Sequence, residues 1–171
     1  MKKNLLYLAV LLCCLFTLSA CGDDDPKENA VASAVYTIDF GVNIHDAASI
    51  IIYYKGENNE TKFEALHPGT FRWTKTVTSK KFPAEFGYKL VISPNSESEL
   101  TFDNYNISIV GTIAGSVSTG GSFNNTNPFI GEISTPKNKV VSTLRSQNGA
   151  SYGYKLNKNG DASRANLNYD L

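Results

Sequence analysis

The sequence has few of the groups on which catalytic and cofactor sites are commonly built. It contains three cysteines and two histidines in 171 residues. Cys13 and Cys14 lie in an amino-terminal apolar segment that we expect to be removed, and Cys21 stands just after it. Residues 22–171 contain no cysteine, so neither a disulfide framework nor a thiolate zinc site can form there. The stability of this part must therefore come from a packed core.

An excess of charge of either sign is also absent. The chain has 16 basic and 16 acidic residues, for a formal net charge of zero. A nucleic-acid-binding domain would show a basic excess, so we predict no nucleic-acid partner. The composition, with 42% hydrophobic and 19% charged residues, excludes a disordered or collagen-like chain and is typical of one that buries a core.

No apolar run is long enough to cross a bilayer as a helix. The longest, residues 5–16, follows two lysines and falls short of the ~30 Å hydrocarbon thickness, so residues 1–20 are predicted to be a secretion signal. The signal ends in Leu-Ser-Ala-Cys at residues 18–21, which resembles the lipobox of bacterial lipoproteins. The resemblance implies lipid attachment at Cys21, and the acyl chains would then hold the protein on a membrane.

Three carboxylates follow the predicted lipid attachment site. Asp23, Asp24 and Asp25 resemble the acidic surface-export signal of Bacteroidota lipoproteins. The resemblance implies an outer-membrane lipoprotein that faces the cell exterior. Residues 21–33, acidic at their start and containing proline, are expected to form a solvated tether.

From residue 34 onward the chain alternates apolar and polar residues with a period of two, and helical patterning is almost absent. The spacing of turn residues predicts about eight to ten strands. We predict one all-β domain over residues 34–171, an antiparallel β-sandwich of the immunoglobulin-like or transthyretin-like kind, with a small β-barrel as the alternative. The strand-like runs are residues 36–42, 49–55, 61–66, 71–77, 86–92, 100–102, 105–113, 129–133, 140–144, 151–157 and 162–169.

The strongest turn signal is Asn159-Gly160, between the last two strand-like runs. Asn-Gly suits the two positive-φ positions of a type I′ turn, so the sequence predicts a β-hairpin with a two-residue loop there.

One segment is distinguished by what it lacks. Residues 104–131 carry no charge, and residues 115–127 consist almost entirely of Gly, Ser, Thr and Asn. The simplest interpretation is a flexible surface loop. The functional interpretation is a neutral recognition loop with adaptable hydrogen-bonding groups, for which Ser122, Asn124 and Asn125 are candidate ligand-binding residues.

Aromatic residues supply the other candidates for binding. Trp73, Tyr53 and Tyr54 could include an exposed ring on which a sugar stacks, although most aromatics in a domain of this size belong to the core. Tyr53 and Tyr54 must point to opposite faces of their strand. At least one of this pair is then either exposed or in a second packing layer, and one exposed aromatic among the three is the binding candidate.

The only catalytic motif is Gly-x-Ser-x-Gly at residues 149–153. A nucleophile elbow needs a strand before the serine, a helix after it and a later histidine, whereas Ser151 opens a predicted strand and both histidines precede it. Three carboxylates, Glu97, Glu99 and Asp103, lie in a segment expected to be extended and exposed, where they serve as solvating charges. We predict no catalytic residue and no enzyme activity.

Metal-binding patterns are equally incomplete. His45 and His67 lack the further ligands that zinc requires. Asn157, Asn159 and Asp161 echo the start of a calcium loop, but the terminal glutamate is missing because residue 168 is asparagine. The sequence thus predicts neither a metal nor another cofactor.

These features favour a surface-anchored lipoprotein with a non-catalytic binding or adhesion domain, whose ligand is a glycan or a protein. The alternative is a structural accessory subunit of an outer-membrane assembly that pairs through an edge strand. A small hydrolase is the third hypothesis, and it would need carboxylates that converge in a cleft.

Overall fold

The computed structural model describes residues 29–131 and 134–171. The predicted signal, the lipidation site Cys21 and the aspartates Asp23, Asp24 and Asp25 lie outside the described residues. The elements are β1 (Ala32–Phe40), α2 (Ile44–Ala47), β2 (Ala48–Lys55), η1 (Glu57–Asn59), β3 (Thr61–Ala65), β4 (Arg72–Ser79), β5 (Ala84–Pro94), η2 (Glu97–Glu99), β6 (Asn104–Tyr105), β7 (Ile109–Val117), β8 (Ser122–Ile130), β9 (Thr135–Pro136), α3 (Lys137–Ser146), β10 (Ser151–Leu156) and β11 (Ala162–Arg164).

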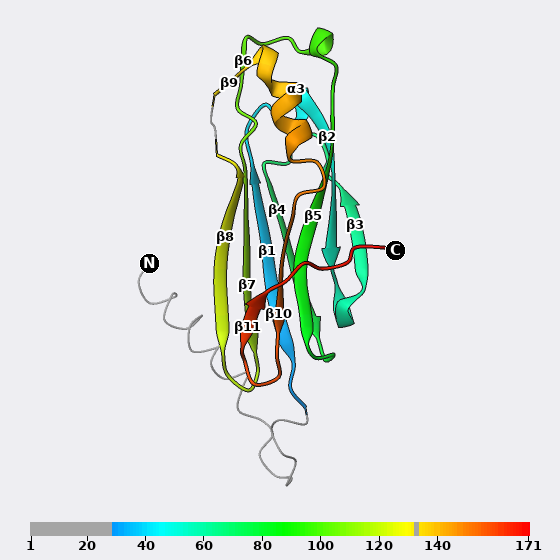
Figure 1. Cartoon of the computed structure of the whole chain (residues 1–171), viewed down its shortest axis with the longest axis vertical. Coiled ribbons are helices and arrows are strands. Elements are labelled where there is room, and N and C mark those ends of the chain that lie inside the picture. Colours follow the sequence, from blue (N-terminus) through cyan, green and yellow to red (C-terminus); the bar gives the residue numbers. More distant parts are fainter. Residues whose placement is uncertain (1–28, 132–133) are drawn as a thin grey trace, which may run out of the picture.

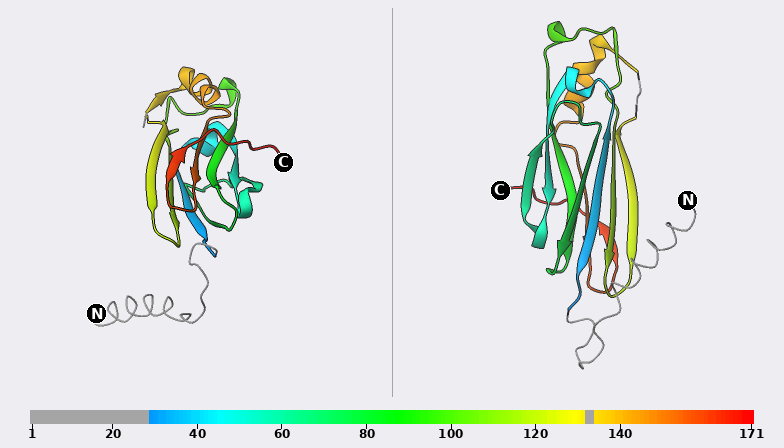
Figure 2. Two further views of the ribbon diagram at one scale, coloured as in Figure 1. Left: turned by 60° about the horizontal axis from the view of Figure 1, so that its bottom comes forward. Right: turned by 180° about the vertical axis from the view of Figure 1, so that it is seen from behind.

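Two antiparallel sheets pack face to face (Figures 1 and 2). Sheet A has the strand order β4-β1-β7-β8, and sheet B has the order β11-β10-β5-β2-β3. A two-stranded ribbon of β6 and β9 lies with α3 at one end of the molecule. Over the described residues neither sheet closes on itself, so the predicted antiparallel sandwich is confirmed and the barrel alternative is not.

The period-two alternation of the sequence sets the inner face of each sheet. On β1, Tyr36 and Ile38 are fully buried, while Thr37 between them faces outward. On β5 the inward-facing residues include Phe86, Tyr88 and Leu90. Each strand thus turns one apolar face inward, and burial of these faces drives the two sheets together.

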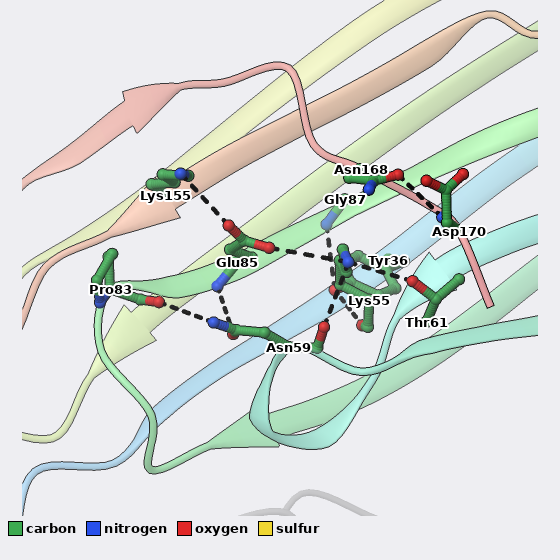
Figure 3. A network of polar contacts seen from close by, with 10 residues as sticks. All are labelled: Tyr36, Lys55, Asn59, Thr61, Pro83, Glu85, Gly87, Lys155, Asn168 and Asp170. Atoms are coloured by element: carbon green, nitrogen blue, oxygen red, sulfur yellow. Dashed lines mark hydrogen bonds and ion pairs between the residues drawn. The ribbon is translucent and has the colours of Figure 1, made fainter.

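Tyr36 connects the two sheets through its hydroxyl group (Figure 3). The ring extends from β1 across the core, and the hydroxyl donates to the backbone oxygen of Lys55 at 2.7 Å and accepts from the Gly87 N–H at 3.2 Å. The β2–β5 ladder ends one residue earlier, at the pair Tyr54–Tyr88. The hydroxyl therefore satisfies backbone groups at the point where these strands separate.

Tyr88 crosses the core in the opposite direction, from β5 toward β7. Its hydroxyl lies against Gly111, where a Cβ atom would overlap the oxygen and lie 2.7 Å from Tyr88 Cζ. Its ring also contacts the rings of Tyr36 and Tyr152, at centroid distances of 6.1 and 6.3 Å. Glycine at position 111 is what makes room for the tyrosine.

The carboxyl-terminal segment crosses the outer face of sheet B. At its start, the Ala165 N–H donates to the Gly153 oxygen at 2.9 Å. Near its end, Tyr169 is buried. The Lys55 ammonium lies 5.6 Å from the centroid of the Tyr169 ring. It also donates to Thr61 Oγ1 at 3.1 Å, as Figure 3 shows. This segment covers a buried lysine that would otherwise face solvent.

The last hairpin forms, but its turn differs from the predicted one. Of the two turn residues only Gly160 has a positive φ, 92°. The Gly160 N–H donates to the Asn157 oxygen, and the Asn157 N–H to the Asp161 oxygen, each at 2.9 Å. This is a three-residue loop with a bulge at glycine, rather than a type I′ turn. The strand after it ends at Arg164 and not at residue 169.

The tips of two hairpins meet at the end of the sandwich opposite α3 (Figure 1). A Cβ atom on Gly121, in the β7–β8 turn, would lie 2.7 Å from the Gly160 Cα in the β10–β11 turn. Beside this contact the Thr119 hydroxyl donates to the Lys158 oxygen at 2.9 Å. The two tips therefore touch backbone to backbone.

Residues 140–144, predicted to be a strand, lie in helix α3. Val140 and Leu144 are its buried residues, and they are four positions apart, a spacing that puts both on one helix face. The strand prediction was wrong. A short apolar run fits both the period of 2 of a strand and the period of 3.6 of a helix, so the sequence pattern alone does not distinguish them.

Further boundaries differ from the prediction. Residues 100–102 follow the short helix η2 and form no strand, and the run at 105–113 is divided between β6 and β7. At the amino-terminal end, Ala30 is already buried and β1 begins at Ala32, so the sandwich includes residues before residue 34.

Substitution Gly111→Ala is expected to destabilise the domain by about 1–3 kcal/mol, because the new methyl group has to displace the Tyr88 hydroxyl from a packed core. Urea unfolding measures the change in free energy. The matched control is Gly131→Ala, since a Cβ there meets no described atom within 4 Å.

The double variant Gly111→Ala/Tyr88→Phe separates this clash from a general effect of alanine in the strand. Removing the hydroxyl should recover part of the lost stability as a coupling between the two sites, because it relieves the overlap with the oxygen but not the close approach to Cζ. Additive effects of the two substitutions would contradict the packing described for this pair.

Candidate functional site

The structure distributes the six candidate binding residues over separate surfaces. Trp73 and Tyr54 are in the core, with 8% and 3% of their surface exposed. Tyr53 is half-buried on the outer side of sheet B, whereas Ser122 and Asn124 are exposed on sheet A. The expected site, an uncharged loop beside an exposed aromatic among these three, is therefore not assembled by the fold.

Trp73 and Tyr54 instead bind a carboxylate at the open edge of the sandwich. Glu64, on β3, accepts from the Tyr54 hydroxyl at 3.0 Å and from Trp73 Nε1 at 2.9 Å, and it pairs with the Lys75 ammonium. Because Glu64 belongs to sheet B and two of its donors to β4 of sheet A, the carboxylate joins the two edge strands. Sequence reasoning missed Glu64, since its position in an alternating strand resembles that of any solvated glutamate.

The hydrogen bonds to Glu64 also set its protonation. Partial burial of the carboxyl group raises its pKa, but the hydrogen bonds from Lys75, Trp73 and Tyr54 outweigh this effect and hold the pKa below its ordinary value. In return, the pKa of Lys75 is raised by its hydrogen bond to Glu64. The pair is thus charged at neutral pH and serves to link the two sheets.

Two shallow depressions flank this carboxylate. One, of about 260 Å³, is lined by Leu66, His67 and Trp73, and the other, of about 300 Å³, by Lys62 and Lys75 among others. Both Glu64 oxygens already accept hydrogen bonds from the protein itself. The edge is therefore better described as a structural link than as a site that awaits a ligand.

Tyr53 stacks beside a residue that the sequence analysis did not single out. Its ring lies 5.6 Å from that of Phe63, its cross-strand partner on β3. Phe63 is 55% exposed and forms the more accessible half of the pair. This two-ring platform faces away from the core on sheet B.

The uncharged segment 115–127 is not a loop. It forms the end of β7, a tight turn at residues 118–121 and most of β8. Within β8, Ser122 and Asn124 are exposed and Asn125 is half-buried on the other side of the strand. The recognition-loop prediction was wrong in its conformation, because polar residues that face water on an edge strand resemble loop residues in sequence.

As a strand, this segment extends an uncharged outer face of sheet A. The registers align Thr76, Val35, Ala114 and Asn124 in one row across the four strands. The rows on either side are Thr74, Thr37, Thr112 and Thr126, and Thr78, Ser33, Ser116 and Ser122. We call these three rows the hydroxyl face, because Ser and Thr occupy every position except three in the middle row.

The hydroxyl face has a hollow between its middle row and the row that contains Ser33 and Ser116. A depression of about 480 Å³ is lined by Val35, Thr76, Ala114, Ser116 and Asn124, among others. Val35 is 40% exposed at its floor. Polar groups around a small apolar centre are the usual composition of a ligand-binding surface.

Hydrogen bonds between neighbouring strands order the hydroxyls of this face. Ser33 Oγ lies 3.2 Å from Ser116 Oγ, and Thr112 Oγ1 lies 3.1 Å from Thr126 Oγ1. None of the twelve residues in the three rows is charged, and Asp39 and Arg72 in the next row form an ion pair at 2.5 Å. The face is therefore preorganised and locally neutral.

The motifs weighed for catalysis lie apart from this face. Ser151 follows α3 and opens β10, so a helix precedes it and a strand follows, the reverse of a nucleophile elbow. Glu97 and Glu99 lie in the short helix η2, where the Glu99 carboxylate accepts from the Ser96 N–H and hydroxyl, both at 2.8 Å. Glu99 thus caps a turn, and the extended conformation expected for these residues was wrong.

The two histidines have different environments. His45 Nε2 lies 3.0 Å from the Thr70 backbone oxygen, and His67 is exposed. Among the residues that the structure describes, no three His, Cys, Asp or Glu side chains form a group suited to a metal ion. In the same residues, no helix combines the length and apolar character needed to span a membrane.

In comparisons with known proteins, no family model, no curated protein and no solved structure matches this chain.

Substitution Glu64→Gln is expected to lower the free energy of unfolding at neutral pH by about 1 kcal/mol. Hydrogen bonds to a charged group are worth more than this, but the side chain is 37% exposed and water screens the pair. Because the folded-state pKa is lowered, the stabilisation is present above the unfolded-state pKa and is lost as the pH falls through the folded-state value. The parent and the variant should therefore converge in acid.

Urea unfolding at neutral pH and at the most acidic pH that preserves the fold measures this difference. Glu97→Gln is the control, because the Glu97 carboxylate makes no hydrogen bond or ion pair to another described residue. A gap between Glu64→Gln and the parent that persists undiminished in acid would contradict the role given to the carboxylate.

Proposed function

We propose that this protein is a lipid-anchored binding module of the outer membrane, exposed to the cell exterior, which uses the hydroxyl face of sheet A to bind a neutral polar ligand. The lipobox ending at Cys21 and the acidic run Asp23, Asp24 and Asp25 support the location. The function is binding or adhesion rather than catalysis.

The observation that carries the proposal is the hydroxyl face itself. The solvent-facing side of a sheet that binds no ligand usually carries scattered charged residues, which favour solubility. Here three adjacent rows contain no charged residue, each of the two outer rows has a hydrogen bond between hydroxyls, and a partly apolar hollow lies between two of the rows. Such a surface can exchange hydrogen bonds with a ligand without desolvating a charge.

A glycan is the ligand class that suits this chemistry best. Its hydroxyl groups can pair with the Ser, Thr and Asn side chains, and its C–H faces can cover Val35 and Ala114. A protein ligand with a neutral polar surface is the second possibility that the same face supports. The platform of Tyr53 and Phe63 on sheet B is a separate aromatic surface, and the experiment below distinguishes it.

The alternative function, a structural accessory subunit that pairs through an edge strand, has one specific observation in its favour. Strand β8 is nine residues long and lies at the edge of sheet A with β7 as its one paired neighbour among the described residues. An open edge of this length is suited to accept another strand.

Substitution Ala114→Tyr, which fills the hollow without adding charge, is expected to reduce capture on a glycan array by about tenfold or more while leaving the melting temperature nearly unchanged. Position 114 is half-buried at the outer surface, so the new ring occupies the space proposed for the ligand and does not disturb the core. A tenfold loss corresponds to about 1.4 kcal/mol of binding free energy.

The matched control is Ser49→Tyr, an exposed strand position on β2 in the other sheet. Capture should remain at the parent level there. Loss of capture in Tyr53→Ala or Phe63→Ala with no effect of Ala114→Tyr would move the site to the aromatic platform and overturn the assignment to sheet A.

Substitution Cys21→Ala is expected to release the protein from the membrane, because lipid attached at this thiol is the proposed anchor. Partition of cells with detergent, followed by immunoblotting of the two phases, measures the change. Cys14→Ala is the control, since that cysteine leaves with the predicted signal. A Cys21→Ala protein that partitions like the parent would rule out the lipid anchor.

A further inference from the structure

The edge strands of the two sheets differ in charge. Sheet A ends in β4 and β8, and sheet B ends in β3 and β11. Strand β8 has nine residues, Ser-Phe-Asn-Asn-Thr-Asn-Pro-Phe-Ile, and none is charged. The other edges carry Arg72 and Lys75 on β4, Lys62 and Glu64 on β3, and Arg164 on β11.

The differences matter because an edge strand offers free backbone N–H and C=O groups to any strand that approaches. Strand β11 is only three residues long, and β3 and β4 are joined to each other through Glu64. Strand β8 forms the outer margin of sheet A in the views of Figures 1 and 2. Its protection is limited to Pro128 and a register shift at its carboxyl-terminal end.

We propose that β8 is an interface between two copies of this chain, which pair antiparallel along residues 122–127 about a two-fold axis perpendicular to sheet A. The pairing joins two four-stranded sheets into one of eight strands.

Charge is the reason for choosing a second copy as the partner. In two-fold pairing every residue lies opposite its own counterpart or a close neighbour, so a charged strand would place like charges together, which is destabilising. Strand β8 alone among the four edges avoids this cost. Its Ser, Thr and Asn side chains can instead form hydrogen bonds across the new pair.

The geometry of antiparallel strands limits the register. Residues that lie directly opposite each other in an antiparallel pair point to the same face of the sheet. The two-fold axis must therefore lie between one residue and its own counterpart in the other copy, and not level with a peptide bond. With the axis at Asn125, Asn124 lies opposite Thr126 of the other copy. With the axis at Asn124, that residue lies opposite itself. Asn124 and Thr126 therefore meet β8 of the other copy in both registers.

This pairing would place the outer faces of the two copies on the same side of the joined sheet. Two hydroxyl faces would then form one continuous surface, and a ligand with repeated units could span both. The self-association does not depend on the ligand, so a failure to capture glycan leaves this proposal unaffected.

The test uses two copies of the full chain with different carboxyl-terminal tags, co-expressed, extracted in mild detergent and captured through one tag. Leu171 is 80% exposed, so the tags do not disturb the core. The parent copies should be captured together. In Asn124→Lys/Thr126→Lys copies, like charges oppose each other across the axis, and co-capture should fall by about fivefold or more.

A charge swap shows whether the loss is specific. When one copy carries Asn124→Lys/Thr126→Lys and the other Asn124→Glu/Thr126→Glu, co-capture should return, and this recovery also shows that the variants are folded. The control Thr74→Lys/Thr76→Lys places the same charges in the same rows at the opposite edge, on β4, and should behave like the parent.

Three results would overturn the proposal. One is the absence of co-capture between parent copies. Another is an equal loss with the lysines on β4. The third is a failure of the oppositely charged pair to recover.

Discussion

The hydroxyl groups of two buried tyrosines constrain how the two sheets can pack. A tyrosine ring fills as much core volume as any residue here except tryptophan, but its hydroxyl must find either a polar partner or an open space at the far wall. Tyr36 finds a partner in the backbone of Lys55 and Gly87. Tyr88 finds space against Gly111, and its hydroxyl has no hydrogen-bond partner among the described residues. The two rings thus fix the spacing and alignment of the sheets in a domain that has no disulfide.

This alignment also determines what remains at the surface. With the large rings turned inward, the outward positions of sheet A are left to small hydroxyl residues, and the face they form is neutral and shallow. On sheet B the carboxyl-terminal segment covers part of the outer face and buries Lys55 beneath Tyr169. The two outer surfaces therefore differ: one is partly covered by the carboxyl-terminal segment, and the other is left uncovered by the residues that the structure describes.

The architecture could be predicted from sequence where alternation and burial coincide, as along Tyr36 and Ile38 or Phe86 to Leu90. The architecture could not be predicted for strands in which neither side is strongly apolar. Strand β8 consists mainly of Asn, Ser and Thr, residues that are as common in turns, and only its pairing with β7 identifies it as a strand. In α3, Val140 and Leu144 fit both periods, and contacts distant in sequence decide between them.

The surfaces were harder to predict than the fold. Exposure of an aromatic depends on what packs above it, so Trp73 and Tyr54 could not be assigned to the core before Glu64 and Lys75 were located beside them. The hydroxyl face joins residues from four strands, and alternation within one strand cannot show which rows become neighbours. Registers between strands supply that information, and these follow from the packing of the core.

The contact between the two hairpin tips has a consequence for local opening. Gly121 and Gly160 touch through their backbones, and Thr119 is bonded to Lys158, so neither tip can fray without losing its support on the other. Amide protons of the β7–β8 and β10–β11 turns should thus exchange with solvent as one cooperative unit, although the turns belong to different sheets and are separated by about forty residues. The two turns would therefore open together and not one at a time.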